Sequence, residues 1–290
     1  MSHYVREAVE RITTRKLAPY ETIKVEPITP IIGAEISGVD LTRELTAQQI
    51  AEIRRAWLEH HVVVFRKQEL SAEDQKRVAR YFGELRQFPI AKFDGGDPEV
   101  VEARSGRDNE HIVGGLWHTD GTGDEAPSAG SFLYMMDMPE VQGGDTMFSN
   151  MHLAYDMMSP AMKAFLEGLT AHHDGIVAWR GHKPPEGFPI ARADHPVVMT
   201  HPENGRKNLF VNSGFTTKIN ELAPFESQQL LQMLYRMIEQ EPILACRIRW
   251  EKHAMVWWDN RCTQHFAVWD YYPYNRHVRR VTINGSKPTL

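Results

Sequence analysis

A series of short apolar segments, separated by turn residues, most constrains what this chain can fold into. Six of these segments are five to seven residues long, at 130–136, 195–201, 207–212, 246–250, 254–258 and 279–284. Their length and their content of β-branched and aromatic residues are typical of strands. The Asn-Gly pair within 202–207 predicts a hairpin that joins two of them. Residues 61–65 are expected to form a further buried strand, and residues 23–41 short strands interrupted by Pro and Gly.

Four helices are expected around these strands. They are predicted to begin at Thr46, Ser71, Ser159 and Pro224, and the last three to end near Gly83, Leu169 and Gln240. Strands and helices do not alternate as a doubly wound sheet requires. We therefore expect a mainly β fold, a sandwich or barrel with flanking helices, in a single domain over residues 23–290. Residues 1–22 are expected to form a loosely attached leader.

Composition narrows the class of protein. The 290 residues are 42% hydrophobic and 24% charged, as in a soluble globular protein. A net charge of −5 gives no basic surface, so nucleic acid is not an expected partner. The longest apolar runs are too short to span a bilayer, the N-terminus lacks a secretory signal, and two cysteines form no disulfide framework. These features predict a cytoplasmic enzyme without a membrane partner.

Three His-x-acid pairs are candidates for metal binding. They are His118/Asp120, His172/Asp174 and His201/Glu203. Residues two apart in a strand point to the same face, so each pair could present a nitrogen and a carboxylate to one metal. With fourteen histidines, more than one such pair is expected by chance. The first pair precedes a loop rich in Gly and Thr that would give a ligand close access, whereas Glu203 is expected to cap a turn and face water.

A third candidate ligand lies near the C-terminus. His265 follows a strongly apolar strand and is itself followed by Arg276, Arg279 and Arg280. Two histidines and one carboxylate leave three positions of an octahedron open, and non-haem Fe(II) uses these for a bidentate co-substrate and O₂. Arginine suits the remote carboxylate of such a co-substrate because its planar fork binds carboxylates bidentately. Taken alone, His265 could be a structural histidine, and the arginines could lie on a solvated face. Because they occur together with the first pair, a metal site is favoured.

Several longer motifs make the sequence similar to one family. They are "IIGAEISGVDL" (31–41), "HVVVFRKQ" (61–68), "YFGEL" (81–85), "LWHTDGT" (116–122), "EVQGGDTMFSNM" (140–151), "THPENGRKNLFVNSGFTTKI" (200–219) and "WWDNRCTQHFAVWDY" (257–271). With them the chain resembles the TauD/TfdA family of Fe(II)- and 2-oxoglutarate-dependent dioxygenases, nearest to the taurine dioxygenase branch. The resemblance covers roughly residues 23–287. It implies a double-stranded β-helix, a jelly-roll barrel with flanking helices.

The resemblance also implies roles for individual residues. As metal ligands it implies His118, Asp120 and His265, and as 2-oxoglutarate-binding residues Thr146 and Arg276. It implies that Arg280 grips an anionic group of the substrate and that Phe215 lines the pocket, with Trp117 and Trp258 either walling the iron site or packing in the core. Trp257, Asp259 and Asn260 are interpreted as structural. The implied reaction decarboxylates 2-oxoglutarate to succinate and CO₂ with O₂ while a substrate carbon is hydroxylated.

Three positions differ from taurine-oxidising members of the family. Those members carry a His, a Tyr and an Asn where this chain has Phe88, Ala91 and Gly114. Polar contacts to a small zwitterion are thus replaced by apolar or absent side chains. We expect an anionic substrate that is bulkier and less polar than taurine, such as an alkyl sulfate, a sulfonate or an aryloxyalkanoate.

Other interpretations stay open at this point. The chain could be a true taurine dioxygenase that releases sulfite and aminoacetaldehyde, a jelly-roll enzyme of another metal, or a non-catalytic relative. Residues 179–194, rich in Pro and Gly, are expected to form either a mobile lid with Trp179 over the substrate or an ordinary surface loop. By resemblance, the chain is expected to form a homo-oligomer, a dimer or tetramer.

Overall fold

A seven-stranded sheet forms the centre of the computed structural model, which describes residues 2–91, 95–110, 112 and 114–290. In spatial order its strands are β1 (Lys24–Pro27), β2 (Ala34–Ser37), β3 (Val62–Phe65), β13 (Met255–Asp259), β5 (Gly130–Asp137), β15 (Arg276–Ile283) and β4 (Val101–Ser105). Only β2 and β3 pair in parallel in this described sheet; the other neighbours are antiparallel. Strands distant in sequence therefore lie side by side, which places residues near 260–283 beside residues near 130.

Three smaller sheets complete the described strands. They are β12 (Ala245–Ile248), β6 (Thr146–Asn150) and β14 (Thr263–Ala267); β11 (Thr216–Ile219), β7 (Thr170–Asp174) and β8 (Arg192–Pro196); and β10 (Lys207–Leu209) with β9 (Val198–Thr200). The β9–β10 pair is the hairpin that the Asn-Gly turn predicted. The mainly β prediction with flanking helices is confirmed. The described strands form four separate sheets, however, and no closed barrel among them.

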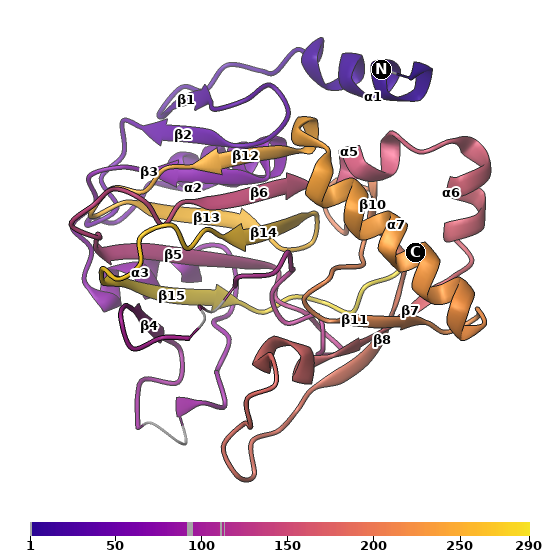
Figure 1. Ribbon diagram of the computed structural model, residues 1–290. Helices are drawn as coiled ribbons and strands as arrows, with labels where there is room; N and C mark the ends of the chain where they lie inside the picture. The colour runs from indigo at the N-terminus through magenta and orange to yellow at the C-terminus, as the bar shows by residue number, and fades with distance from the viewer. Residues whose placement is uncertain (1, 92–94, 111, 113) are drawn as a thin grey trace.

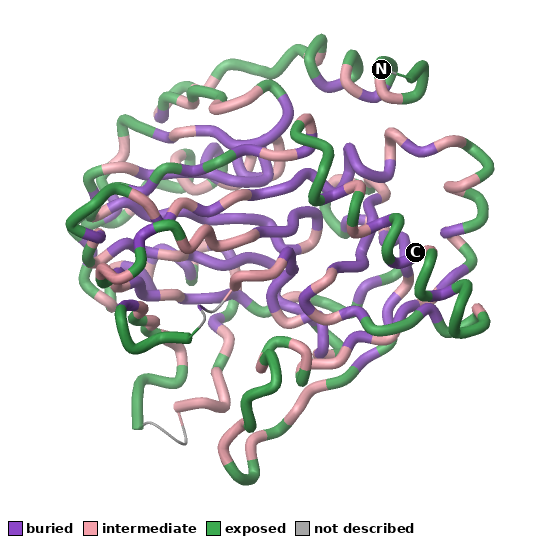
Figure 2. The backbone as a smooth tube through the Cα atoms, in the orientation of Figure 1, coloured by how far each residue is buried: buried purple, intermediate pink, exposed green. Residues whose placement is uncertain are grey.

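The alternation of side chains along β13 builds two apolar layers. Trp257 stacks on Trp57 at a ring separation of 4.0 Å on the face that the helices cover. Its neighbour Trp258 points to the opposite face and packs 5.4 Å from Phe148 of β6. Because successive strand residues face opposite sides, one strand joins the helix-covered layer to the layer between the sheets. Figure 2 shows the buried positions concentrated along these strands.

The helices lie around the sheets (Figure 1). They are α1 (His3–Thr13), α2 (Ala47–His60), α3 (Ala72–Arg80), α5 (Met151–Asp156), α6 (Pro160–Leu166) and α7 (Pro224–Gln240), with 3₁₀ turns η1 (Gly175–Trp179) and η2 (Pro242–Leu244). The capping box at Thr46 and the bounds of α7 are as predicted. α3 and α6 end three residues earlier than expected. No helix in the described part of the chain is long and apolar enough to cross a membrane.

Two segments differ from the sequence-based expectation because of long-range packing. Within residues 1–22, expected to be a loose leader, α1 buries Ala8 and Ile12 in the same apolar layer as α5. The last predicted strand begins at Arg276 rather than at residue 279, because Arg276 pairs with Ser105 of β4. The local sequence pattern reveals neither the packing of α1 with α5 nor the pairing of β15 with β4.

Candidate active site

Backbone pairing places the two candidate histidine ligands opposite each other. His118 lies in the segment between β4 and β5, and His265 lies in β14. The two form an isolated antiparallel bridge, with His118 N donating to His265 O at 3.1 Å and His265 N donating to His118 O at 2.8 Å. Directly opposed residues of such a bridge share a face, and the two imidazole rings lie 4.0 Å apart.

Asp120 joins this pair because it lies two residues after His118 on the same face. Its Oδ1 lies 3.6 Å from His118 Nε2 and 3.8 Å from His265 Nε2. All three side chains are buried, and one atom from each lies within 4.8 Å of the others. The structure thus brings together His118, Asp120 and His265, as the sequence predicted.

Neighbouring groups fix the state of these three side chains. His118 Nδ1 lies 2.7 Å from the carbonyl of Leu116; donation to it leaves Nε2 with its lone pair toward Asp120. Burial acts to raise the pKa of Asp120, but Arg280 and the two histidines outweigh it and hold this pKa well below its ordinary value. Burial lowers the pKa of His265 well below that of a free imidazole. An ionised carboxylate and imidazole nitrogens with free lone pairs are the forms that bind a divalent cation.

A cavity of about 750 Å³ opens on one side of the cluster. His265, Thr146, Trp258 and Arg276 are among the residues that line it. Arg276 is only 7% exposed, and its Nε and Nη2 have no hydrogen-bond partner among the described residues. Burial lowers the pKa of this guanidinium and outweighs the opposite influence of Tyr271 and Asp145. Thr146 Oγ1 accepts from Trp250 Nε1 at 3.0 Å, so its own proton stays available to a ligand.

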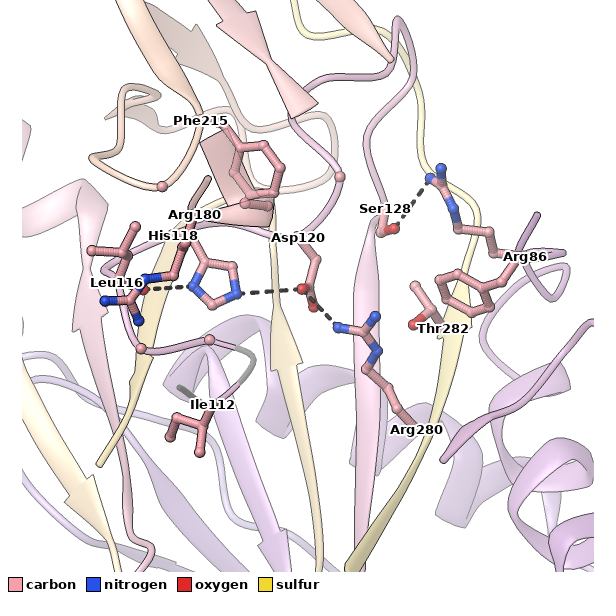
Figure 3. A pocket seen from close by; sticks show the side chains of 16 residues that line it. Arg86, Ile112, Leu116, His118, Asp120, Ser128, Arg180, Phe215, Arg280 and Thr282 are labelled. Carbon is pink, nitrogen blue, oxygen red and sulfur yellow. Dashed lines mark hydrogen bonds and ion pairs between the residues drawn. The ribbon is translucent and has the colours of Figure 1, made fainter. Parts of the chain in front are cut away.

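A second cavity, of about 250 Å³, is lined by His118 and Asp120 (Figure 3). Four of the residues expected to bind substrate, Phe88, Gly114, Phe215 and Arg280, also line it. Among the described residues that line either cavity, Ala91 does not occur, so the geometry gives it no contact in the pocket. Gly114, His118 and Arg280 line both cavities, which therefore adjoin each other beside His118.

The two tryptophans expected near the iron site differ in position. Trp258 lies 4.7 Å from the His265 ring and lines the larger cavity. Trp117 packs on Phe266 at 5.8 Å and is not among the described residues that line either cavity. Trp258 therefore walls the site, whereas Trp117 packs in the core.

The other two His-x-acid pairs are held by different partners. His172 Nδ1 lies 2.6 Å from Asp194, and Asp174 accepts from Arg192. His201 is fully buried and contacts Asp259 at 3.0 Å. The side chain of Glu203 binds Arg54 and Arg261 rather than only capping its turn.

Sequence reasoning missed the residues that orient Asp120. Ser131 Oγ donates to Asp120 Oδ2 at 2.7 Å, and Asn260 Oδ1 accepts from the Asp120 backbone N–H at 3.3 Å. Asn260 was interpreted as structural, and it acts so, although its partner is 140 residues away. Ser131 lies in a strand without any motif. Only the pairing of β5 with β13 and β15 reveals its position.

Fold and site together define a class of protein: a mainly β chain that brings together two histidines and one carboxylate, the combination that non-haem Fe(II) oxygenases use as metal ligands. A family model described as "Taurine catabolism dioxygenase TauD, TfdA family" matches residues 24–282. The chain is 33% identical over 291 residues to an alkylsulfatase of Acinetobacter baylyi, covering 96% of this chain and 90% of that protein. It is also 33% identical over 282 residues to an alpha-ketoglutarate-dependent sulfonate dioxygenase of Saccharomyces cerevisiae, covering 92% and 68%.

A solved structure agrees with these sequence matches. The crystal structure of a taurine dioxygenase from Burkholderia xenovorans aligns with a TM-score of 0.81 and 34% identity, over 93% of this chain and 91% of that one. The chain belongs to the TauD/TfdA family. It is an oxidoreductase, a dioxygenase dependent on 2-oxoglutarate (alpha-ketoglutarate).

Proposed function

We propose that this chain uses Fe(II), 2-oxoglutarate and O₂ to hydroxylate a small anionic organic substrate, with release of succinate and CO₂. The observation that carries the proposal is the convergence of His118, Asp120 and His265 beside two cavities, one of which is lined by a buried arginine, Arg276, whose Nε and Nη2 have no hydrogen-bond partner among the described residues. Two imidazoles and a carboxylate suit Fe(II) and leave coordination positions for other ligands. When bound, the iron and the co-substrate would supply the oxidising chemistry.

The larger cavity fits 2-oxoglutarate. Buried guanidinium N–H groups without hydrogen-bond partners cost free energy that a carboxylate would restore through a bidentate pair. Arg276 offers Nε and Nη2 for this pair, and Trp250 supports its guanidinium at 5.6 Å from the indole ring. The Thr146 hydroxyl lines the same cavity and would donate to the same carboxylate. Together they orient the co-substrate toward His265 and exclude water from its remote end.

The smaller cavity fits an anionic substrate with an apolar body. Arg280 supplies the cation, with its guanidinium carbon 5.4 Å from the centre of the Phe88 ring. Phe215 lies 6.2 Å from His118 on the opposite side. Gly114 has a φ of 86°, and a Cβ there would approach His118 Cε1 to 3.3 Å, so a side chain at this position would crowd the ligand. Apolar side chains beside Arg280 favour a substrate that is bulkier and less polar than taurine.

Arg180 adds a second cation at the mouth of this cavity. It follows η1 at the start of residues 180–191, and its side chain reaches over Gly115 (Figure 3). Its guanidinium forms no hydrogen bond or ion pair with the described residues. An anionic head group between Arg180 and Arg280 would be held from both sides. Trp179, the last residue of η1, packs on Phe188 at 5.2 Å, within the segment 179–194 that was expected to form either a lid or an ordinary surface loop.

The sheets support a jelly-roll arrangement as part of this proposal. The seven-stranded sheet and the β12–β6–β14 sheet face each other through Trp258 and Phe148, and the His118–His265 bridge pairs the segment between β4 and β5 with β14. We infer that they are the two walls of a double-stranded β-helix in one domain over residues 23–290. A homo-oligomer, dimer or tetramer, remains a prediction that light scattering in solution would test.

Succinate formed from 2-oxoglutarate, with Fe(II), ascorbate and O₂, tests the function across taurine, longer alkylsulfonates, alkyl sulfates and aryloxyalkanoates. Stimulation by a bulky anion above that by taurine is the expected result. Preference for taurine would contradict the substrate class while keeping the reaction. If no reaction formed succinate, neither those with a candidate substrate nor the slow reaction without one, the result would contradict the dioxygenase activity itself.

A further inference from the structure

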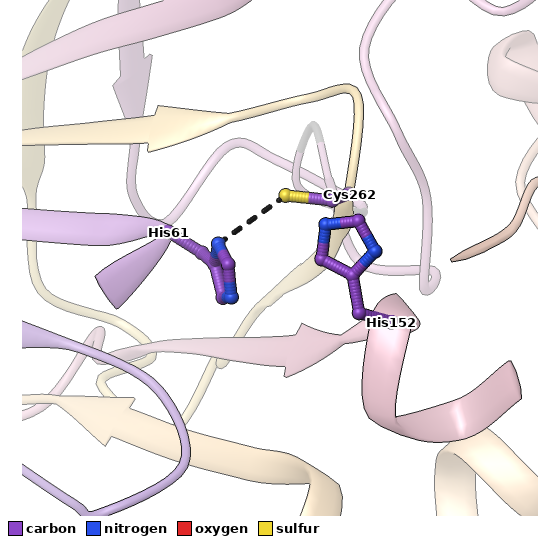
Figure 4. Close-up of side chains that lie close together, drawn as sticks. All are labelled: His61, His152 and Cys262. Atoms are coloured by element: carbon purple, nitrogen blue, oxygen red, sulfur yellow. Dashed lines mark hydrogen bonds between the residues drawn. The ribbon is translucent and has the colours of Figure 1, made fainter. Parts of the chain in front are cut away.

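A second cluster of ligand-type side chains is buried away from the active site. His61, His152 and Cys262 each offer one atom within 4.8 Å of the others, and each residue is at most 1% exposed (Figure 4). The three come from the end of α2, the first turn of α5 and the turn between β13 and β14. We propose that they form a second metal site, selective for Zn²⁺ or another thiophilic cation and independent of the proposed iron centre.

The geometry of the cluster suits a tetrahedral ion. His61 Nδ1 lies 3.5 Å from Cys262 Sγ. Ligand bonds of about 2.3 Å to sulfur and 2.0–2.1 Å to nitrogen give a tetrahedral N–S separation of about 3.6 Å. The pair is therefore already at the spacing that one shared ion requires. His152 supplies the third ligand and leaves one tetrahedral position to a non-protein ligand such as water.

A backbone carbonyl supports the His152 ring in the orientation of a ligand. His152 Nδ1 lies 2.9 Å from the carbonyl of Lys207, and donation to it leaves Nε2 as an acceptor; the Asn204 side-chain amide lies 3.4 Å from this Nε2 and would release it when an ion binds. A hydrogen bond from the second ring nitrogen to a backbone carbonyl is the usual support of a metal-bound histidine.

The backbone holds the three residues in place before any ion binds. His61 has a φ of 66°, an uncommon conformation outside glycine, which turns the chain from α2 into β3. Its carbonyl accepts from Asp259 N at 2.9 Å, and the carbonyl of Cys262 accepts from Met151 N at 3.0 Å. Each ligand is thus tied through the backbone to an element that carries or adjoins another ligand.

The charge and the ligand atoms of the cluster determine which cation it would prefer. On binding, the S–H proton leaves to solvent as the sulfur–metal bond forms, so a dication gains one thiolate. The Asp259 carboxylate, within 4.8 Å of the sulfur, offsets part of the remaining charge, although it is already bound to His201 and Arg261. Two imidazoles and a thiolate favour zinc, whereas the active site offers no sulfur.

Cobalt substitution separates the two sites because only a thiolate gives a sulfur-to-cobalt charge-transfer band in the near ultraviolet. The chain would be produced in cobalt-supplemented medium, so that the metal is present while the buried cluster forms. We expect the band in the wild-type chain and in Cys246→Ser, which removes the other buried thiol. It should vanish in Cys262→Ser and in His152→Gln, with circular dichroism confirming that each variant is folded.

Elemental analysis completes the test. After production in zinc-supplemented medium, His118→Ala should retain one equivalent of zinc, and Cys262→Ser should lose one equivalent relative to wild type. A folded wild-type chain without the thiolate band, whatever its cobalt content, would overturn the proposal. So would a band that persists in Cys262→Ser. Because the readout is the sulfur–metal bond, failure of the proposed oxygenase function would leave this result unchanged.

Discussion

Arg280 Nη1 donates to Asp120 Oδ1 at 2.9 Å, the same oxygen that faces the Nε2 atoms of His118 and His265. The residue proposed to grip the substrate anion is thus also the counter-ion of a proposed metal ligand. A metal ion bound by the histidines would compete with Arg280 for Asp120, and an anion in the smaller cavity would compete with Asp120 for Arg280. Substrate binding and the position of Asp120 are therefore coupled through one guanidinium.

Replacement of Arg280 separates substrate binding from co-substrate use. Arg280→Gln should raise KM for the anionic substrate by one to two orders of magnitude, since a charged partner of a buried anion contributes about 2–3 kcal/mol. Arg86→Gln is the matched control, because Arg86 lines the same cavity but is bound to Asp124 at 2.6 Å. Steady-state kinetics at saturating 2-oxoglutarate measures both. Equal effects of the two substitutions would contradict the role of Arg280.

Arg276 should limit stability in the absence of co-substrate. Because Nε and Nη2 are buried without partners, Arg276→Met should leave the free energy of unfolding unchanged or raise it, while KM for 2-oxoglutarate rises more than tenfold. Arg279→Met is the control: Arg279 donates to Gln75 and to the carbonyl of Leu70, so its loss should cost about 2–3 kcal/mol. Urea unfolding compares them. A large loss of stability in Arg276→Met would show that the guanidinium already has a partner.

Ser131 should tune the affinity of the metal ligands. Ser131→Ala removes the hydrogen bond to Asp120 Oδ2, and loss of such a support weakens metal affinity by about 10–100-fold. Ser149→Ala is matched in size and burial, but Ser149 Oγ has no partner among the described residues. Fe(II) affinity, measured by anaerobic titration, should change only in the first variant. No change in Ser131→Ala would mean that Asp120 is oriented by Arg280 and the backbone alone.

Buried histidines predict that the fold weakens as pH falls. Burial lowers the pKa of His173 to about 3, below the ordinary value of 6.5. Between these values the unfolded chain binds a proton that the folded chain does not, so stability is lost as pH decreases through this window. His173→Gln should reduce the loss between pH 6.5 and 5 by about 2 kcal/mol, as measured by urea unfolding. An identical pH dependence in the variant would contradict a neutral buried His173.

More of the candidate site than of the fold around it could be predicted from the sequence. His118 and Asp120 are neighbours in sequence, and a strand period places them on one face. That His265 lies opposite His118 depends on a bridge across 147 positions of the chain, which no local pattern encodes. The motifs of the family supplied that pairing. The support from Ser131 had no motif, so the sequence could not reveal it.

Local signals predicted helix starts better than strand limits. Side-chain caps such as Thr46 act within a few residues, and they are found where the sequence places them. Strand ends depend on partners, as β15 shows by extending to Arg276 through β4. Ala91 was assigned to the pocket by position alone, and no contact in either cavity supports that assignment among the described residues.

Anaerobic addition of Fe(II) and 2-oxoglutarate tests the central claim most directly. A chelated 2-oxo acid on iron gives a visible charge-transfer band, which reports the metal ligands and the co-substrate site together. We predict the band in wild type and in Ser149→Ala, its absence in His118→Ala, and a requirement for much more 2-oxoglutarate in Arg276→Met. No band in the wild-type chain, or an unchanged band in His118→Ala, would contradict the assignment of this site.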